Sequence, residues 1–240
     1  MQSHDNHLVA SLPTADRARL RALCEPVHLE LGQVLCSQGQ PSRHVWFPTD
    51  SFISLIAEVD GQHDLEVGMA GREGMLGVHL ALDIPREPLK ALVQGAGAAW
   101  RIGAAPFRAE LARSEALRQR LNKYLYVQMA QRAASAACLR FHEIGPRLAR
   151  WLLMTQDRAH ADRFELTQEF VAKMLGVRRV GVTASAGGLQ RLGLIKYHRG
   201  ELHVLDRAGL EAAACSCYAT DQLLFTRIMG ARRAQLPSAV

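Results

Sequence analysis

The side chains with the most distinctive chemistry lie between residues 166 and 205, where arginines stand beside small and aliphatic residues. Arg178 and Arg179 are followed by Val180, Thr183 and Ala184. A guanidinium group can donate two hydrogen bonds to guanine O6 and N7, and a small aliphatic side chain can contact a thymine methyl group. If one helix presents these residues together, they have the chemistry to read base edges in double-stranded DNA.

The residues around this group have the spacing of two short helices that cross at a tight turn. Thr167 is suited to cap the first helix, because its hydroxyl can accept a hydrogen bond from an unpaired backbone N–H. Gly176 permits the left-handed backbone that ends this helix. Ala172, Gly176 and Val182 supply a small residue, a glycine four positions later and an aliphatic residue six positions after that. This spacing predicts a helix-turn-helix whose second helix begins near Arg178.

A strand, a turn and a second strand follow the second helix directly. The runs Leu194–His198 and Glu201–Leu205 are separated by Arg199 and Gly200. Two such runs around a two-residue turn predict a β-hairpin. A hairpin at this position makes the unit a winged helix, with Arg199 at the tip of the wing.

The expected DNA contacts fall into two groups. Base edges are read from the N-terminal part of the second helix, while phosphate contacts set the register without reading sequence. We expect base readout from Arg178, Arg179, Val180, Thr183 and Ala184, and phosphate contacts from Thr167, Gln168, Lys173 and Arg199. For any single arginine, the alternative of a solvated surface charge stays open.

The charge of the chain is divided between its two parts. The 240 residues carry a formal net charge of +6 and 48% hydrophobic residues, which excludes a disordered or fibrous chain. Residues 1–110 hold 9 Lys and Arg against 13 Asp and Glu, whereas residues 111–240 hold 20 against 10. The basic second part is therefore the one expected to bind a polyanion. An arginine-rich solvated helical surface is the alternative.

Short apolar segments recur between turn residues in the acidic first part. They are VHLEL, VLC, HVWF, SFISLIAEV, DLEVGM, MLGVHLAL, LKALVQ and AAWRI. About eight strands at this spacing, after a short helix that begins near Thr14, predict an antiparallel sandwich, jelly roll or barrel.

A long helical segment joins the two parts. The run from Ser114 to Ile144 contains no glycine or proline, and about 28 helical residues would extend roughly 40 Å. Its apolar stripe consists of Leu117, Leu121, Tyr124, Leu125, Gln128, Ala133 and Ala137. We expect this stripe to pack against a second copy of the chain in a homodimer. The alternative is a helix that lies along its own β domain.

Two segments carry a resemblance to a known family. They are LTQEFVAKMLGVRRVGVTASAGGLQRLGLIKYHRGELHVLD in the second part and GREGMLG in the first. In these segments the chain resembles the Crp/Fnr family of bacterial transcription regulators. The resemblance implies an α+β chain with an N-terminal antiparallel β-roll or jelly roll, a long dimerisation helix and a C-terminal winged helix-turn-helix. It also implies a homodimer on a two-fold symmetric operator with half-sites about one DNA turn apart.

The expected domains follow from this order of elements. Residues 1–110 form a cyclic-nucleotide-binding-like effector domain, 111–145 the dimerisation helix and hinge, 146–218 the DNA-binding domain and 219–240 a C-terminal helical tail. Of the residues with which the best-known members read the groove, Arg179 alone carries over. Val180 and Ala184 stand where those members have an acidic residue and a second arginine, so a different operator is expected.

The implied effector pocket departs from the family pattern. Cyclic-AMP-binding relatives have a Glu for the ribose hydroxyl and an Arg for the cyclic phosphate, and this chain has Val78 and Leu89 at these positions. A buried phosphodiester without its cation loses a charge-assisted hydrogen bond, which argues against cyclic AMP as the usual effector. Arg86 or Lys90 could substitute for the missing cation. The candidate pocket residues are Glu66, Gly68, Arg72, Glu73, Gly77, Val78, Leu89 and Lys90. For Glu66, Arg72 and Glu73, a surface turn charge is the alternative.

No cofactor is predicted. The five cysteines are odd in number and scattered, which favours reduced thiols over a disulfide framework. The oxygen-sensing branch of the family uses an N-terminal cysteine cluster for iron-sulfur, and no cysteine precedes Cys24 here. Cys215 and Cys217 resemble half of a metal or redox site, but no complementary Cys or His pair with zinc spacing lies nearby in the sequence. Two free thiols on a helix are the favoured interpretation, and no metal is predicted.

The expected partners are double-stranded DNA, a second copy of the chain and an unknown small-molecule effector, with RNA polymerase as a further candidate. No apolar run reaches the roughly 20 residues of a membrane span. The N-terminus shows no signal or lipidation motif, so a cytoplasmic protein without membrane contact is expected.

No phosphate-binding loop, dinucleotide fingerprint or nucleophile elbow is present, and no enzyme is predicted. The alternative hypothesis is a small-molecule-binding or enzymatic β-roll whose helical half only mediates oligomerisation. A third hypothesis is constitutive DNA binding without an effector.

Overall fold

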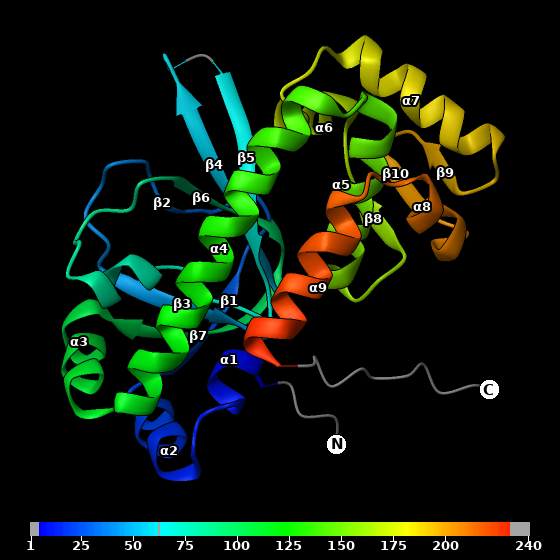
Figure 1. Cartoon of the computed structure of the whole chain (residues 1–240). Helices are drawn as coiled ribbons and strands as arrows, with labels where there is room; N and C mark the ends of the chain where they lie inside the picture. Colours follow the sequence, from blue (N-terminus) through cyan, green and yellow to red (C-terminus); the bar gives the residue numbers. More distant parts are fainter. Residues whose placement is uncertain (1–4, 62, 231–240) are drawn as a thin grey trace.

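The structure is a computed structural model that describes residues 5–61 and 63–230. Figure 1 shows a β-rich part built by the N-terminal half and a mostly helical part built by the C-terminal half, with the long helix α4 between them. This arrangement confirms the predicted α+β fold. Among the described residues, no helix is both long and apolar enough to cross a membrane.

Two antiparallel sheets form the β-roll. One sheet has the strand order β1-β7-β3 and the other the order β2-β6-β4-β5. The strands are β1 (Glu25–Leu29), β2 (Val34–Cys36), β3 (His44–Pro48), β4 (Phe52–Val59), β5 (His63–Ala70), β6 (Lys90–Gly95) and β7 (Gly97–Gly103). Buried residues of both sheets, such as Leu29, Trp46, Ile53 and Val93, form one core cluster between them. Seven of the eight predicted strand segments are therefore confirmed.

The eighth predicted strand, MLGVHLAL, is wrong. This segment contains the short 3-10 helix η1 (Val78–Leu82). Gly77 and Asp83, on either side of η1, have φ angles of 89° and 58°. A residue in the left-handed region interrupts an extended strand, so the chain turns inward and buries Val78 and Leu80 of η1 in the β-roll core.

Helices cover the outer side of the roll. They are α1 (His7–Ala10), α2 (Thr14–Ala22) and α3 (Ala104–Arg113). The predicted start at Thr14 is confirmed. The long helix α4 (Glu115–Phe141) has 27 residues, and the Ser114 hydroxyl caps it by accepting a hydrogen bond from the N–H of Leu117 at 3.1 Å.

Over the first half of α4, the apolar stripe that was predicted to contact a second copy faces the chain's own β-roll. Leu117, Leu121 and Tyr124 are buried in the β-roll core, and the Tyr124 hydroxyl accepts a hydrogen bond from the N–H of Met75 at 3.2 Å. The expectation that these residues contact a second copy is therefore wrong, because the β-roll already covers them. The alternative of a helix that lies along its own β domain is correct for this part of α4.

A different stripe of α4 is exposed. Its residues alternate three and four positions apart along the helix: Gln119, Asn122, Tyr126, Met129, Ala133, Ala136 and Arg140. Tyr126 and Met129 are 50% and 61% exposed. This spacing keeps one seam of a helix facing a partner helix.

The C-terminal half packs around α5 (Ile144–Ala159). Its other elements are β8 (Arg163–Glu165), α6 (Gln168–Leu175), α7 (Arg179–Arg191), β9 (Ile195–His198), β10 (Glu201–Val204) and α8 (Arg207–Ala213). The three strands form an antiparallel sheet in the order β8-β10-β9. One core cluster joins the helix-turn-helix, the sheet and α5, and it also includes Ile56 and Met69 of the β-roll.

The last helix, α9 (Cys217–Met229), returns from α8 along α4, as the orange and red ribbon of Figure 1 shows. Its residues Phe225 and Met229 are buried in the β-roll core. The predicted domain boundaries at 110 and 145 fall inside α3 and α5, and that at 218 falls inside α9. Residues 231–240 of the predicted tail lie outside the described residues.

Candidate nucleic-acid interface

The helix-turn-helix is held by a cap, a left-handed turn and an apolar inner face. The Thr167 hydroxyl accepts a hydrogen bond from the N–H of Phe170 at 3.1 Å, so Thr167 caps α6 as predicted. Gly176 ends α6 with a φ of 61°. A Cβ at this position would lie 2.8 Å from Cδ1 of Leu65 in β5, so this turn also needs glycine for the close approach of the β-roll. The buried inner face of α7 consists of Val182, Ala186 and Leu189.

The outer face of α7 carries the residues predicted to read bases. Val180 is 72% exposed, and Arg179, Thr183 and Ala184 are exposed with it. Arg178 occupies the N-cap position and its side chain makes no cap hydrogen bond. Spacings of three and four residues place side chains on one helix face, so α7 presents this group together.

One hydrogen bond joins the two helices at this surface. The Thr183 hydroxyl lies 2.6 Å from Oε1 of Gln168 and 3.1 Å from the carbonyl oxygen of Arg179. Gln168 was predicted to bind phosphate. With its oxygen accepting from Thr183, its NH₂ group remains the donor that can face a phosphate oxygen.

The wing has the geometry of a tight hairpin. Arg199 and Gly200 have φ angles of 49° and 85°, and His198 pairs with Glu201 on either side of them. Two consecutive residues with positive φ correspond to a type I′ turn. The Tyr197 hydroxyl donates to the carbonyl oxygen of Leu166 at 2.7 Å, which ties the wing to the start of α6. The exposed Arg199 therefore lies at the tip, as predicted.

The basic side chains of this surface are not engaged by acidic groups of the described chain. Within residues 5–61 and 63–230, no ion pair involves Lys173, Arg178, Arg179 or Arg199. Exposed cations without internal partners remain available to the phosphates and base edges of DNA.

One basic residue of this surface was missed by the sequence reasoning. Arg191 is exposed in the last turn of α7, eleven positions after Val180 and thus on the same helix face. A Cβ at Gly187 or Gly188 would meet only the Arg191 guanidinium, at 3.6 and 3.9 Å. This side of α7 is therefore open within the described residues.

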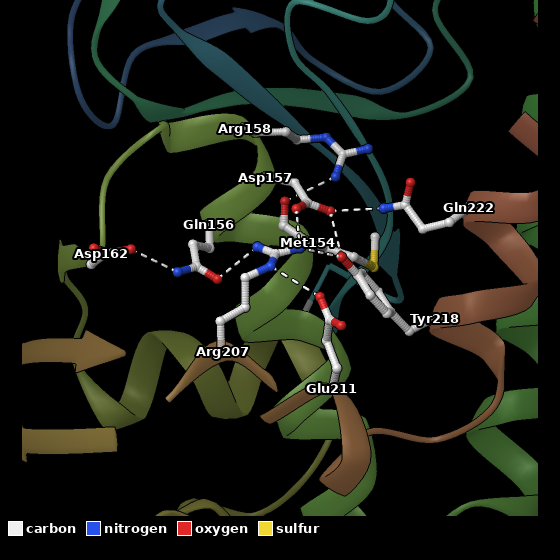
Figure 2. Close-up of polar contacts among 9 residues, drawn as sticks. All are labelled: Met154, Gln156, Asp157, Arg158, Asp162, Arg207, Glu211, Tyr218 and Gln222. Carbon is white, nitrogen blue, oxygen red and sulfur yellow. Dashed lines mark hydrogen bonds and ion pairs between the residues drawn. The ribbon is translucent and has the colours of Figure 1, made fainter. Parts of the chain in front are cut away.

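A polar network joins α5, α8 and α9. Figure 2 shows Arg207 of α8 at its centre. Arg207 donates to Gln156 and Asp157 of α5, both at 2.8 Å, and to the hydroxyl of Tyr218 at 2.7 Å. Asp157 also accepts hydrogen bonds from Tyr218 at 2.9 Å and from Gln222 of α9 at 2.8 Å. This network fixes α8, α5 and α9 relative to one another.

The helix α5 also contacts the β-roll through buried polar groups. Arg158 of α5 forms an ion pair with Glu73 at 2.7 Å, and their side chains are only 7% and 9% exposed. Glu66 of β5 accepts hydrogen bonds from Nε1 of Trp151 at 3.0 Å and from the Ser54 hydroxyl at 2.6 Å. Desolvation by the surrounding protein raises the pKa of Glu66 to about 7.

The eight candidate pocket residues do not surround one cavity. Glu66, Gly68 and Leu89 line a cavity of about 340 Å³ between the β4–β5 hairpin, α4, α5 and α6. Neither Lys90 nor Arg86 is among the described residues that line this cavity.

The other pocket candidates lie elsewhere. Arg72, Glu73 and Lys90 form ion pairs with Asp50, Arg158 and Glu58, respectively. Gly77 and Val78 lie at the start of η1, where Val78 is buried in the β-roll core. Arg86 donates to the carbonyl oxygen of Gly39 at 2.9 Å.

The cavity itself has a mixed lining. Trp151, Met154 and Met174 contribute apolar surface, and Arg132 and Arg150 contribute guanidinium groups. The Nε atoms of Arg132 and Arg150 are buried and have no hydrogen-bond partner among the described residues. Such a lining suits a small molecule with an apolar body and an acceptor or anionic group.

The C-terminal half and the whole fold both match known proteins. Residues 146–213 match the family model of the Crp-like helix-turn-helix domain. No curated protein sequence matches the chain significantly.

Three solved structures illustrate the shared fold. A transcriptional regulator of the Crp/Fnr family from Eubacterium rectale is similar with a TM-score of 0.68 and 16% identity, over 87% of this chain and 99% of that chain. The c-di-GMP-responsive global regulator CLP of Xanthomonas campestris gives 0.66 and 15% identity, over 81% and 100%. A CRP/FNR-family regulator from Thermus thermophilus gives 0.64 and 20% identity, over 79% and 98%. Residues 146–213 are thus a Crp-like helix-turn-helix domain, on a chain that has the fold of the Crp/Fnr transcription regulators.

Proposed function

We propose that this protein is a homodimeric transcription regulator that binds a specific two-fold symmetric DNA operator. The outer face of α7 carries the proposal, since it presents Arg179, Val180, Thr183 and Ala184 together. The nearby cations also have no ion-pair partner in the part of the chain that the structure describes. A helix in the major groove reads base edges through its N-terminal residues. In this proposal Arg178 or Arg179 contacts a guanine, and Val180 or Ala184 contacts a thymine methyl.

Phosphate contacts hold α7 in register. Thr167 and Gln168 lie at the N-terminus of α6, Lys173 lies in its last turn and Arg199 lies at the wing tip. These four residues border the outer face of α7 and bind the backbone on both sides of the groove.

The exposed stripe of α4 is the proposed dimer contact. Tyr126 and Met129 supply its large apolar side chains, and Ala133 and Ala136 allow close approach of a second helix. Because the residues alternate three and four positions apart, two copies of α4 can pack as a coiled coil. Such a dimer places two copies of α7 around a two-fold axis, where successive major grooves lie about 34 Å apart.

The test of dimerisation is a change in this stripe. Replacing Met129 by Glu puts a charge in the seam of each helix, so a monomer is expected by sedimentation equilibrium. Lys123→Glu, on an exposed position of α4 six residues before Met129 and therefore on another side of the helix, is the matched control and should stay dimeric. A Met129→Glu protein that remains dimeric would place the contact elsewhere.

The cavity between the β-roll, α4, α5 and α6 is the proposed effector site. It adjoins Glu66 and Trp151, which link the β-roll to the DNA-binding part, so an occupant can shift the balance between dimer arrangements. An anionic ligand is expected, because Arg132 and Arg150 line the cavity. The departure from the family pattern at Val78 and Leu89 argues against cyclic AMP as this ligand. Cyclic di-GMP, to which CLP responds, belongs among the ligands to be screened.

The direct test of the proposed function is selection of bound duplexes from a random DNA pool. We expect enrichment of a two-fold symmetric sequence whose affinity falls steeply with salt. Failure of every sequence to compete better than random DNA would overturn the proposal and favour a β-roll protein whose helical half only oligomerises. Thermal-shift screening with nucleotides, haem and metabolites then separates effector control from constitutive binding. RNA polymerase is tested as a partner by transcription from the selected operator.

A further inference from the structure

Four side chains with soft metal-binding atoms meet where α4 ends. Cys138 and His142 lie four positions apart, at the last turn and the C-cap of α4. Cys215 lies in the connection between α8 and α9, and Cys217 is the first residue of α9. Their Sγ atoms and the His142 ring nitrogen all lie within 4.8 Å of one another.

This grouping supplies the complementary pair that the sequence spacing did not reveal. Cys138 and Cys215 are 77 positions apart in the chain. They meet because α9 runs back along α4, which brings the start of α9 to the end of the long helix.

The distances fit one tetrahedral ion. Zinc binds cysteine sulfur at about 2.3 Å and histidine nitrogen at about 2.0–2.1 Å, so a tetrahedron separates two sulfurs by about 3.8 Å and a sulfur and a nitrogen by about 3.6 Å. Here Sγ of Cys138 lies 3.6 Å from Sγ of Cys215, and Sγ of Cys217 lies 3.6 Å from Nδ1 of His142. A multi-iron cluster spreads its cysteines further apart, so the geometry favours a single ion.

The surroundings balance the charge of such a site. Three thiolates and a divalent ion carry a net charge of −1. Arg147 and Arg150 are buried and close enough to Cys138 and Cys215 to interact with them electrostatically.

We propose that Cys138, His142, Cys215 and Cys217 form a zinc site of the Cys₃His type. The three thiols release their protons to solvent when the ion binds, and the neutral His142 ring supplies Nδ1. Cys24 and Cys36 take no part, since they belong to the β-roll and lie outside the group.

The position gives the ion a structural role. His142 and Glu143 separate α4 from α5, so the site lies beside the joint between the long helix and the DNA-binding domain. The N–H of Cys215 donates to the carbonyl oxygen of Pro146 in α5 at 3.2 Å. A bound ion would therefore hold the end of α4, the start of α5 and the start of α9 in one arrangement.

The test uses Co²⁺ as a probe of the reduced, metal-free full-length protein, without DNA. We expect saturation at one Co²⁺ per chain, with the strong visible bands of tetrahedral cobalt and a sulfur-to-cobalt charge-transfer band. Equimolar Zn²⁺ should bleach both bands. The weak spectrum of octahedral Co²⁺, or no saturable binding, would overturn the proposal.

Variants assign the ligands. His142→Ala and Cys217→Ser remove partly exposed residues, so the fold should persist by circular dichroism while the affinity for Co²⁺ falls at least tenfold. Cys24→Ser and Cys36→Ser are the matched controls and should bind as the parent does. His142→Cys should restore tight binding and raise the charge-transfer intensity, which loss of structure could not produce.

Two further outcomes contradict the proposal. An unchanged cobalt spectrum in both His142→Ala and Cys217→Ser would exclude these residues as ligands. Mass analysis after alkylation under non-reducing conditions could show a Cys138–Cys215 disulfide in protein isolated without added oxidant, and such a bond would leave too few thiolates for the ion. Because neither readout uses DNA, failure here is distinct from failure of the proposed function.

Discussion

Cationic side chains in two regions of the molecule have opposite surroundings. At the junction with the β-roll and α9, three arginines have buried or half-buried carboxylate partners: Arg150 with Asp221 at 2.6 Å, Arg158 with Glu73 at 2.7 Å and Arg207 with Asp157 at 2.8 Å. On the helix-turn-helix and the wing, Lys173, Arg178, Arg179 and Arg199 have no ion-pair partner within the described part of the chain.

The difference shows that the basic charge of the second half has two uses. A buried guanidinium needs an internal carboxylate because desolvation penalises an unpaired charge. An exposed guanidinium needs none, and an internal partner would compete with phosphate for it. We call the three arginines with carboxylate partners the paired set and the four exposed cations the unpaired set. Net charge alone does not distinguish the two sets. Only the unpaired set is expected to contribute to the salt dependence of DNA binding.

The largest expected effect is on the paired set. Glu73→Ala leaves the Arg158 guanidinium buried without its partner, which should destabilise the protein by about 3–5 kcal/mol in urea unfolding. The double variant Glu73→Leu/Arg158→Leu removes both charges and should recover most of this loss. If the double variant is as unstable as the single one, the packing of this junction matters more than its charge.

A second effect concerns Glu66, a carboxyl at the same junction. Burial raises its pKa to about 7 from an ordinary value of 4.5, against the opposite influence of Ser54, Trp151, Arg158 and Arg150. Between these pH values the folded state holds a proton that the unfolded state has released, so the free energy of unfolding falls as the pH rises from about 4.5 to about 7. This decrease in the free energy of unfolding is complete once the pH exceeds the pKa of Glu66 in the folded state.

The check is the thermal midpoint at pH 5.5 and pH 8. Glu66→Gln carries no titrating proton, so the difference between the two midpoints should be smaller in this variant than in the parent protein. Equal differences in the two proteins would mean that other groups govern the pH dependence.

In the unpaired set, Arg179→Ala should weaken binding to the selected operator by about 1–3 kcal/mol and relax preference at one base position, without a change in thermal midpoint. Fluorescence anisotropy on operator variants measures both properties. Arg113→Ala, which removes an exposed arginine of α3, is the control and should bind as the parent does. A uniform loss over all operator variants would instead make Arg179 a phosphate contact.

Arg199→Ala should weaken all sequences alike and lower the slope of log affinity against log salt by about 1. Arg199→Asn removes the same charge with a residue that suits the positive φ of a type I′ turn. Both variants should therefore show the same slope. A loss confined to one operator position would contradict the assignment to phosphate.

The smallest effect tests the open side of α7. Gly188→Ala should stabilise the protein by about 0.5–1 kcal/mol, because its Cβ meets only the Arg191 guanidinium at 3.9 Å. Gly181→Ala is the matched contrast, since its Cβ would lie 2.7 Å from Cδ1 of Ile144. Equal gains in the two variants would show that this contact relaxes freely.

Local signals made the winged helix predictable from sequence. The Thr167 cap, the Gly176 turn and the two-residue turn at Arg199 each depend on backbone and side-chain properties of a few neighbouring residues. Seven strands were predictable for the same reason. The segment of η1 has a strand-like composition, and the positive φ at Gly77 and Asp83 that interrupts it is a product of tertiary packing.

The features that depend on long-range packing could not be predicted from the sequence. The apolar stripe of α4 was correctly identified as buried, but a sequence does not state whether a second copy or its own β-roll covers Leu117 and Tyr124. The cysteines were judged by spacing, whereas Cys138 and Cys215 meet only through the return of α9. The pocket prediction transferred ligand positions from the family to this chain. In the structure, however, Arg72, Glu73 and Lys90 form ion pairs and do not line the cavity.

The return of α9 to the β-roll also affects how the winged helix can be displaced. Besides the joint after α4, the burial of Phe225 and Met229 of α9 in the β-roll core attaches this part of the chain a second time. Ile56 and Met69 of the β-roll, which share the core cluster of the helix-turn-helix, add a third attachment. A displacement of α7 relative to the β-roll must therefore rearrange packed contacts as well as the joint, so its free-energy cost is set by side-chain packing and not by backbone flexibility alone.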